Sequence, residues 1–321
     1  MADKTGIEWC DATWNPVVGC SVHSPGCIHC YAMPLAARLE RMGNPAYAGL
    51  TQPSKTGPVW NGIVRLNPST LEQPLRWKKP RRIFVNSMSD LFHENLADDA
   101  IDEVFGVMGA CEDAGLGHTF IILTKRAERM QQYMARRAAQ AWNSRRLGPD
   151  AHPPRNIICG VSAEDQTRWD ERLAHLRETN ALYRAVSVEP MIGPIEPSAE
   201  DMLALDWVIV GGESGPKARP MHPDWVRDIR DLCQVAGVYF FFKQWGEWLA
   251  GEGNYGQFDA TPMSAYRRCD NHRYEWPRYT AANNFGTHPD PWSGPIAARR
   301  VGKKAAGAML DGVEHREFPQ L

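Results

Sequence analysis

Short apolar runs alternate with helical patterns through most of this chain, and this alternation limits its fold more than any other feature. The runs are rich in β-branched residues and span residues 62–66, 82–86, 119–123, 156–161, 183–188, 207–210 and 238–242, with a further candidate at 17–20. Such runs are typical of buried parallel strands. Alternation at this spacing predicts βαβ units and an α/β fold. The number of strands favours a full or partial (β/α) barrel over an open sheet.

Four segments carry the helical patterns, at residues 98–112, 128–146, 165–178 and 224–236. In the first, apolar residues recur every three or four positions from Ile101 to Met108, as in an amphipathic helix packed on a sheet. The alternation stops near residue 250, and residues 251–295 are rich in Gly, Asn, Pro and aromatic residues. We therefore expect a β/α barrel over residues 1–250. An irregular C-terminal lobe or lid, packed on the barrel, is expected over residues 251–321.

Polar residues and glycines gather directly after the predicted strands. They are Asn86, Ser87, Asp90, Lys125, Arg126, Ser162, Glu164, Glu189, Gly211, Gly212, Glu213, Lys243 and Gln244, with Trp245 beside them and Ser187 just before Glu189. The carboxyl ends of parallel strands form the active-site face of β/α barrels. Turn and cap chemistry accounts for some of these residues, and the two adjacent glycines also fit a tight turn. We expect the functional site at this edge.

The overall charge is close to zero, with 36 Lys+Arg against 38 Asp+Glu and a formal net charge of −2. This balance excludes a uniformly basic nucleic-acid coat but leaves room for local basic grooves. Basic residues cluster at 76–82, 125–146 and 299–304, next to Trp77, Trp142 and Trp245. Such clusters could hold a phosphate backbone and stack bases, or could be solvated surface.

Eight cysteines in 321 residues are too few for a disulfide scaffold. The first residues lack an apolar core of signal-peptide length, and no run reaches the ~18–20 apolar residues of a membrane span. We therefore expect a soluble protein of a reducing compartment, with no membrane partner.

Three cysteines, Cys20, Cys27 and Cys30, lie on one predicted loop. Three soft ligands this close suit zinc or an iron–sulfur cluster. A structural zinc site needs four ligands, and the fourth would have to be His23, His29 or Cys10. A 4Fe–4S cluster held by three cysteines instead leaves one iron open to a substrate or cofactor.

The two closely spaced cysteines, followed by Tyr31, Ala32 and a helical stretch at 35–38, resemble radical S-adenosylmethionine (SAM) enzymes, in particular the branch of spore photoproduct lyase. Six residues separate Cys20 from Cys27, a wider spacing than is usual there. Further blocks, at residues 7–9, 11–16, 84–93, 123–130, 160–166, 186–191, 207–215 and 241–248, are similar to a phage-associated radical-SAM-like family. The likeness covers about residues 7–250 and resumes near 300–319.

The resemblance implies a barrel of the radical-SAM type, a 4Fe–4S cluster on the three cysteines, SAM as cofactor and a one-electron reductant as partner. The cluster would cleave SAM to a 5′-deoxyadenosyl radical that abstracts hydrogen from the substrate. Cofactor contacts are expected from Tyr31, Asn86, Ser87, Lys125, Arg126, Ser162, Glu164, Ser187, Glu189, Gly211, Gly212 and Glu213. Among these, Lys125 or Arg126 suits the methionyl carboxylate. The Gly-Gly-Glu motif resembles the amino-group motif of the superfamily but follows a late strand.

The resemblance also makes nucleic acid the expected partner. Our working hypothesis is hydrogen abstraction from a base during thymine hypermodification of phage DNA, for instance rearrangement of an aminoacyl-thymine adduct. The residues expected to line the substrate pocket are Asp90, His93, Lys243, Gln244 and Trp245, and no catalytic residue is assigned. A radical lyase that repairs DNA lesions and a non-enzymatic zinc-binding interaction module are the alternatives. The expected location is the cytoplasm, that of the host if the chain is phage-encoded.

Overall fold

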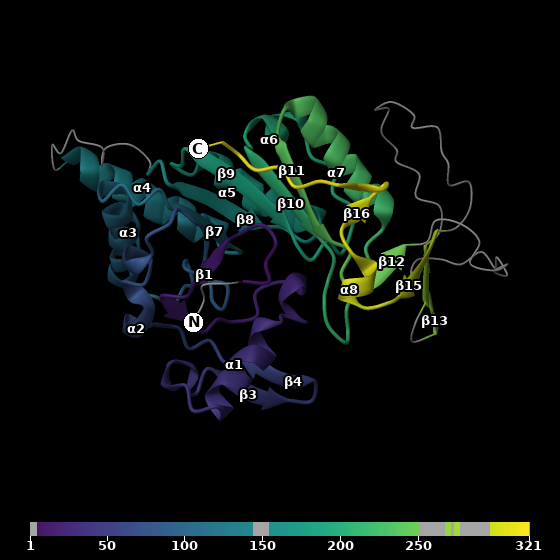
Figure 1. Cartoon of the computed structure of the whole chain (residues 1–321), viewed down its shortest axis with the longest axis horizontal. Helices are drawn as coiled ribbons and strands as arrows, with labels where there is room; N and C mark the ends of the chain where they lie inside the picture. The colour runs from purple at the N-terminus through teal and green to yellow at the C-terminus, as the bar shows by residue number, and fades with distance from the viewer. Residues whose placement is uncertain (1–4, 144–153, 251–266, 271–272, 277–295, 321) are drawn as a thin grey trace.

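The centre of the molecule is a curled sheet of seven parallel strands that forms a half-barrel (Figure 1). The structure is a computed structural model that describes residues 5–143, 154–250, 267–270, 273–276 and 296–320. The strand order is β1 (Ala12–Trp14), β6 (Arg82–Val85), β7 (Thr119–Thr124), β8 (Ile157–Ser162), β9 (Tyr183–Val188), β10 (Trp207–Gly211) and β11 (Tyr239–Gln244). The predicted α/β class and partial barrel are confirmed.

Helices connect the parallel strands from β6 onward and cover one face of the sheet. They are α3 (Asp98–Asp113), α4 (Ala127–Asn143), α5 (Gln166–Glu178), α6 (Ala199–Leu203) and α7 (Pro223–Ala236). The apolar stripe predicted from Ile101 to Met108 is buried on α3. Helix α7 ends at Gly237, which adopts the left-handed conformation (φ 71°) that favours glycine. The four predicted helices are confirmed to within one residue at the ends that the structure describes, and the predicted residues 144–146 lie outside the described residues. The short α6 was not predicted.

The strand predicted at residues 62–66 is wrong as a member of the parallel sheet. Only β5 (Arg65–Leu66) is extended there, and it pairs antiparallel with β2 (Val17–Val18), the remnant of the candidate at 17–20. The run is short because Gly62 has a positive φ of 85° and Pro68 starts a helix soon after Leu66. The first strand of the sheet is instead β1, whose three residues are too few to give an apolar run.

A long segment between β1 and β6 carries several small elements. They are η1 (Pro25–Cys27), α1 (Ala32–Arg41), η2 (Pro45–Tyr47), the hairpin of β3 (Thr51–Ser54) and β4 (Gly57–Trp60), α2 (Pro68–Leu71) and η3 (Pro74–Arg76). In Figure 1, α1 and the hairpin lie below the sheet, while α6 and α7 lie above it. The half-barrel is thus flanked by structure on both sides.

Side chains alternate across the sheet and give its two faces different cores. One face packs Val85, Ile122 and Val208 against the helices. The other, concave face carries Ile121, Ile158 and Trp207 in a separate cluster. Trp9, Trp207, Phe241 and Phe318 form the aromatic part of this second cluster, which we call the aromatic plug; the ring centroids of Trp207 and Phe318 are 5.6 Å apart. The plug fills the concave face toward the amino-terminal ends of the strands.

The C-terminal segment contains regular structure. The strands β12 (Trp248–Ala250), β15 (Ile296–Arg300), β14 (Arg273–Trp276) and β13 (Arg267–Asp270) form an antiparallel sheet, followed by α8 (Lys303–Ala306), β16 (Met309–Leu310) and β17 (Val313–Glu314). The C-terminal lobe, which was expected to be irregular, thus contains short strands, and the charged residues of β13, β14 and β15 hide the apolar alternation there. The rest of 251–295 lies outside the described residues. Near the end of the chain, the Phe242 N–H donates to the His315 oxygen at 3.0 Å, beside the edge of β11.

None of the helices in the described ranges combines the length and the apolar character that a membrane span requires.

Candidate active site

The three predicted ligands lie on residues 19–31, which we call the cysteine loop. The loop begins at Gly19, where φ is 91° and a Cβ would lie 2.0 Å from the Ile63 oxygen, so only glycine fits. The turn η1 forms its middle, and α1 begins two residues after Cys30. All three cysteines are free thiols of intermediate exposure. The loop lies at the carboxyl ends of the parallel strands, because residues that follow β7, β8 and β10 contact it.

Burial and neighbouring charges shift the pKa of two of the three thiols, Cys20 and Cys30. Burial raises the pKa of the Cys20 thiol to about 12; Asp90 and the other two cysteines add to the rise, and Arg126 opposes it. Burial also raises the pKa of Cys30, with a further contribution from Cys27. Cys20 is therefore protonated at neutral pH in the metal-free chain, and metal binding there would release its proton.

Two of the three candidate fourth ligands of a zinc site are engaged elsewhere in the fold. Within the described residues, no three or more His, Cys, Asp or Glu side chains converge as ligands of a single metal ion do. Of the possible fourth zinc ligands, Cys10 is buried beside the aromatic plug and His29 contacts Glu213 through Nδ1 at 3.2 Å. In a 4Fe–4S cluster each cysteine binds a different iron, so the thiols need not converge on one point.

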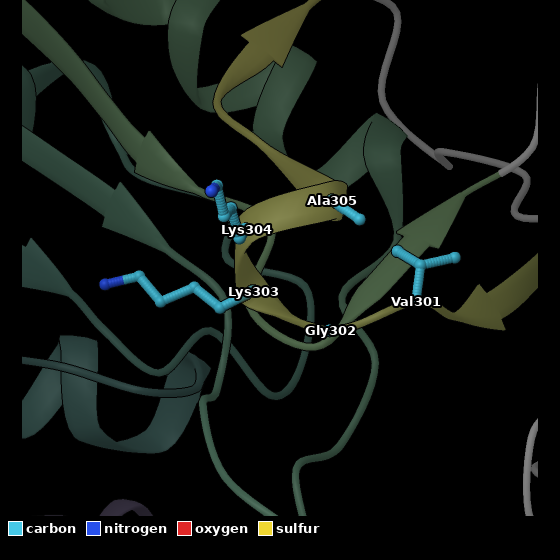
Figure 2. Close-up of a pocket in the computed structure, with 5 residues that line it drawn as sticks. All are labelled: Val301, Gly302, Lys303, Lys304 and Ala305. Carbon is cyan, nitrogen blue, oxygen red and sulfur yellow. The ribbon is translucent and has the colours of Figure 1, made fainter.

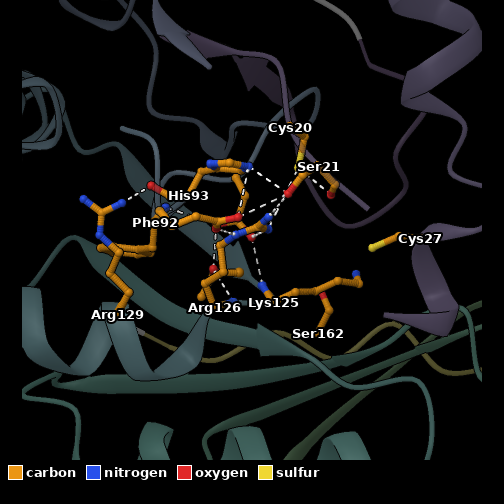
Figure 3. Close-up of polar contacts among 12 residues, drawn as sticks. Cys20, Ser21, Cys27, Phe92, His93, Lys125, Arg126, Arg129 and Ser162 are labelled. Carbon is orange, nitrogen blue, oxygen red and sulfur yellow. Dashed lines mark hydrogen bonds and ion pairs between the residues drawn. The ribbon is translucent and has the colours of Figure 1, made fainter. Parts of the chain in front are cut away.

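Arg126 holds the beginning of the cysteine loop (Figure 3). Its Nη2 donates to the Ser21 hydroxyl at 2.7 Å, and its Nη1 donates to Asp90 at 3.1 Å and lies 4.0 Å from the Cys20 sulfur. His93, which is fully buried, also contacts the Ser21 hydroxyl, through Nε2 at 2.9 Å. Since His93 Nδ1 accepts from the Asn95 N–H, Nε2 carries the proton. Burial, together with the nearby Arg126, lowers the pKa of His93 to about 4.

Asp90 is the anchor of this network. It accepts hydrogen bonds from the Thr124 hydroxyl, the backbone N–H groups of Phe92 and Lys125, and the Arg126 guanidinium. Burial alone would raise the pKa of Asp90, but Arg126 and these donors hold it below its ordinary value. Asp90 and His93 were predicted to touch substrate and Arg126 to touch cofactor, yet their polar groups are engaged by the protein.

Glu164 holds the middle of the loop. One carboxylate oxygen accepts the Gly26 N–H at 2.9 Å and the other accepts from Arg172 at 2.9 Å. Both members of this ion pair are buried, and a Cβ on Gly26 would lie 3.0 Å from the carboxylate carbon. Burial alone would raise the pKa of Glu164, but Lys125 and Arg172 hold it below its ordinary value.

Glu213 holds the last part of the loop. Its carboxylate accepts from both Nε and Nη2 of Arg219, at 2.8 and 2.6 Å, and contacts His29. Arg219 in turn donates to the Pro25 oxygen at 3.1 Å. Burial alone would raise the pKa of Glu213, but Arg219 and His29 hold it below its ordinary value. Glu164 and Glu213, both predicted to bind cofactor, thus bind the cysteine loop.

A second set of predicted residues faces the concave side and, in the part of the chain that the structure describes, makes no hydrogen bond or ion pair with the cysteine loop: Lys125, Ser162, Ser187, Glu189 and Lys243. Alternation from Ile121, Ile158, Ala185 and Phe241 of the inner cluster places them on this face. Lys243 Nζ lies 2.6 Å from a Glu189 carboxylate oxygen. Among the described residues, no hydrogen bond or ion pair engages the Lys125 ammonium or the hydroxyls of Ser162 and Ser187. Figure 3 shows Lys125 and Ser162 on the side of the site where Cys27 lies.

Gly211, the last residue of β10, and Gly212 are glycines for two different structural reasons. A Cβ on Gly211 would lie 3.1 Å from the carboxylate carbon of Glu189, so Gly211 gives that side chain its place. A Cβ on Gly212 would lie 2.0 Å from the Trp245 oxygen, so Gly212 permits the close approach of two backbones. Gln244 donates to the Gly212 oxygen at 3.1 Å, and the buried Trp245 donates to the Met309 oxygen at 2.8 Å. Gln244 and Trp245 are therefore internal supports rather than an open lining.

Asn86, Ser87 and Tyr31 lie beside the cysteine loop. Asn86 has a positive φ of 62°, and its side-chain oxygen accepts the Val17 N–H at 3.2 Å. The Tyr31 hydroxyl donates to the Ser87 backbone oxygen at 2.7 Å, which ties α1 to the loop after β6. These predicted cofactor residues thus join the neighbouring segments to each other.

The predicted basic clusters are largely used for internal contacts. Arg129 pairs with Asp98 at 3.0 Å, which joins α4 to α3, and Arg82 pairs with Asp11 at 3.1 Å. Trp77 is buried like Trp245, which removes both as open stacking surfaces; the side chain of Trp142 lies outside the described residues. The third cluster contributes to a surface pocket lined by Val301, Gly302, Lys303, Lys304 and Ala305 (Figure 2).

Sequence reasoning missed four residues that hold the loop: Ser21, Gly26, Arg172 and Arg219. Arg172 offered a signal, because it shares the buried face of α5 with Trp169, Leu173 and Leu176, where an arginine needs a buried partner. Arg219 offered none, because it lies in an irregular connection between β10 and α7.

One comparison with known proteins identifies a relationship. A family model described as protein of unknown function (DUF5131) matches residues 4–319, nearly the whole chain. The curated proteins and the solved structures gave no match. The chain therefore belongs to the DUF5131 family.

Proposed function

We propose that this protein is a radical SAM enzyme. The observation that carries the proposal is the position of the three-cysteine loop, at the carboxyl ends of a parallel half-barrel and beside polar side chains that face the concave side. This is the edge at which β/α barrels place their active sites. The sequence resemblance to radical SAM enzymes supports the same assignment independently of the geometry.

Cys20, Cys27 and Cys30 would hold the 4Fe–4S cluster, and the open iron would leave room for SAM. When bound, the cluster would supply one-electron cleavage of SAM and hence hydrogen abstraction from a substrate. Lys125 has the charge for the methionyl carboxylate, and its ammonium lacks a protein partner among the described residues. Ser162 and Ser187 offer small hydroxyl groups to the ribose. The aromatic plug closes the lower part of the concave face and would keep water from the reacting groups.

The Glu189–Lys243 pair is the best candidate for orienting the cofactor. Its 2.6 Å contact lies at the ends of β9 and β11, between the serines and the open edge of the sheet. A paired carboxylate and ammonium present an acceptor and a donor in a fixed geometry, which suits ribose hydroxyls or a substrate amide.

The proposed substrate is a nucleic-acid base, in a hypermodification reaction of phage DNA. This part of the proposal comes from the sequence resemblance, because many basic residues of the predicted clusters form internal ion pairs. Anaerobic turnover with base-modified DNA, followed by mass spectrometry of the nucleosides, tests it. Release of 5′-deoxyadenosine with an unaltered nucleoside profile would contradict the DNA substrate but not the radical chemistry; conversion of photoproduct-containing DNA would favour the repair alternative.

Metal analysis after anaerobic purification tests the enzyme class. We expect about four irons and four sulfides per chain, together with 5′-deoxyadenosine release from SAM under a strong reductant. About one zinc per chain with no iron or sulfide would contradict the assignment as a radical SAM enzyme and favour the zinc-binding interaction module.

A further inference from the structure

We propose that three polar clamps preassemble the cysteine loop before any metal binds. This inference rests on the proposed function only for the role of the thiols as cluster ligands. The clamps themselves are contacts between protein atoms. Each clamp holds the residue next to one cysteine: Ser21 follows Cys20, Gly26 precedes Cys27, and His29 precedes Cys30. The spacing of the clamps therefore matches the spacing of the ligands.

The clamps come from three different strands of the half-barrel. Arg126 follows β7, Glu164 follows β8 and Glu213 follows β10. Each of these side chains is buried and bonded to a second charged residue, at distances of 2.6–3.1 Å. Because the loop is bonded to residues that follow three strands of one sheet, the sheet fixes its position, as a functional site requires.

Apart from backbone hydrogen bonds in its turns, the bond from Tyr31 to Ser87 and the packing of Cys20 and Cys30, the cysteine loop has few contacts that keep it ordered. Its regular structure is the three-residue turn η1, and its largest apolar side chains, Val22 and Ile28, are 45% and 57% exposed. Fixing the backbone of each residue costs about 1–2 kcal/mol of conformational free energy, which burial of these side chains does not offset. Hydrogen bonds to charged groups, each stronger than neutral ones, are therefore the main source of order.

The second clamp is the tightest. The Glu164 carboxylate lies against the Gly26 backbone so closely that any side chain at Gly26 would force it to move. The same carboxylate neutralises the buried Arg172 guanidinium, which also donates to the Ser162 backbone oxygen. Removing Glu164 would leave Arg172 buried without its counter-charge, a strongly destabilising change. Loop position and the end of β8 are thus fixed by one ion pair.

The consequence is a ligand loop that is ordered without metal, unlike metal sites that fold only when the metal binds. It also explains why Arg126, Glu164 and Glu213 follow the strands as cofactor residues would, although protein atoms occupy their polar groups. These three are positioning residues, and the contact with cofactor is left to the unengaged set around Lys125.

Hydrogen–deuterium exchange on the full-length chain, stripped of metal under anaerobic conditions, tests the clamps. We expect the amides of residues 21–31 to be protected in the metal-free wild type. Glu164→Ala should speed exchange of the Gly26 amide about tenfold or more while α3 and α7 keep their protection. Glu164→Gln, which retains an acceptor for the Gly26 N–H, should recover most of the protection. Glu171→Ala, an exposed position on the same helix as Arg172, is the matched control and should change nothing.

A second variant guards against global unfolding of Glu164→Ala. Arg219→Gln shortens the side chain that donates to the Pro25 oxygen, at a position that is 29% exposed, and it should speed exchange of the amides of residues 26–30 without loss of folded protein. Equal loop exchange in the wild type and in every clamp variant would overturn the inference. A protected loop in a chain that takes up no iron would contradict the proposed function alone. Iron uptake by a chain whose metal-free loop is unprotected would contradict the clamps alone.

Discussion

The two ends of the concave face are built from different chemistry, although the same strands run through both. Toward the amino-terminal ends, Trp9, Trp207, Phe241 and Phe318 pack into an apolar cluster in which segments from both ends of the described chain meet. Toward the carboxyl ends, buried carboxylates and guanidinium groups bind the cysteine loop. The apolar end therefore contributes to stability alone, whereas the polar end also holds the predicted ligands, so substitutions of the thiols and of the aromatic plug should have separable effects.

The largest effect is expected at the polar end. Cys27→Ala should abolish iron and sulfide incorporation, because two thiolates cannot retain a 4Fe–4S cluster. Stability of the metal-free chain should be nearly unchanged, since the Cys27 side chain is only partly buried. Metal analysis beside a denaturant titration measures both quantities.

Cys111→Ala is the matched control, because Cys111 is fully buried on α3 and far from the cysteine loop in the fold. It should lower the free energy of unfolding but leave iron content unchanged. Equal loss of iron in both variants would contradict the ligand assignment.

At the apolar end, Trp207→Ala should lower the free energy of unfolding by about 3–5 kcal/mol, as large-to-small substitutions in cores do. Trp207 is fully buried and contacts Trp9, Phe241 and Phe318. The folded fraction should still take up iron. Leu203→Ala, at a position that is 79% exposed, should change stability by less than about 0.5 kcal/mol. Loss of iron uptake by folded Trp207→Ala would show that the two ends are not separable.

A smaller effect is expected from the pair of Glu189 and Lys243. Lys243→Met removes the charge that pairs with Glu189 and should weaken SAM binding about tenfold, with little change in stability because both side chains keep some exposure. Equilibrium dialysis of the reconstituted protein gives the affinity. Arg230→Met breaks a comparable pair with Asp311, at 2.6 Å, on α7 over the other face of the sheet, and should leave SAM affinity unchanged. An identical SAM affinity in wild type and Lys243→Met would remove this pair from the cofactor site.

The smallest effect is a pH dependence of stability. Asp90, Glu164 and Glu213 have pKa values below their ordinary range, so their contribution is present above the unfolded-state pKa near 4 and is lost as the pH falls through the lower folded values. The free energy of unfolding should decline by roughly 1 kcal/mol between pH 5 and pH 4, and faster below that. Denaturant midpoints measured across this range check it. A flat profile would show that the carboxylates do not gain from their partners.

The α/β class, the four longer connecting helices and most of the parallel strands followed from the alternation of apolar runs, because burial of both sheet faces leaves a strong pattern. The first strand of the sheet could not be predicted in this way, since β1 has only three residues. The longer apolar run at 62–66 is not a strand of this sheet, and its Gly62 has a positive φ. The grouping of polar residues at one sheet edge was also predictable from topology. The sequence could not show which of these residues hold the cysteine loop and which face the concave side, because this depends on partners such as Arg172 and Arg219 that are distant in sequence.

Electron paramagnetic resonance of the reduced, reconstituted protein tests directly whether the three cysteines hold a 4Fe–4S cluster that binds SAM. We expect the signal of a reduced 4Fe–4S cluster that changes when SAM is added, because SAM would bind the one iron that no cysteine holds. The signal should be absent from Cys27→Ala and present in Cys111→Ala. A protein that binds zinc and gives no such signal, or a cluster signal that SAM does not alter, would contradict it.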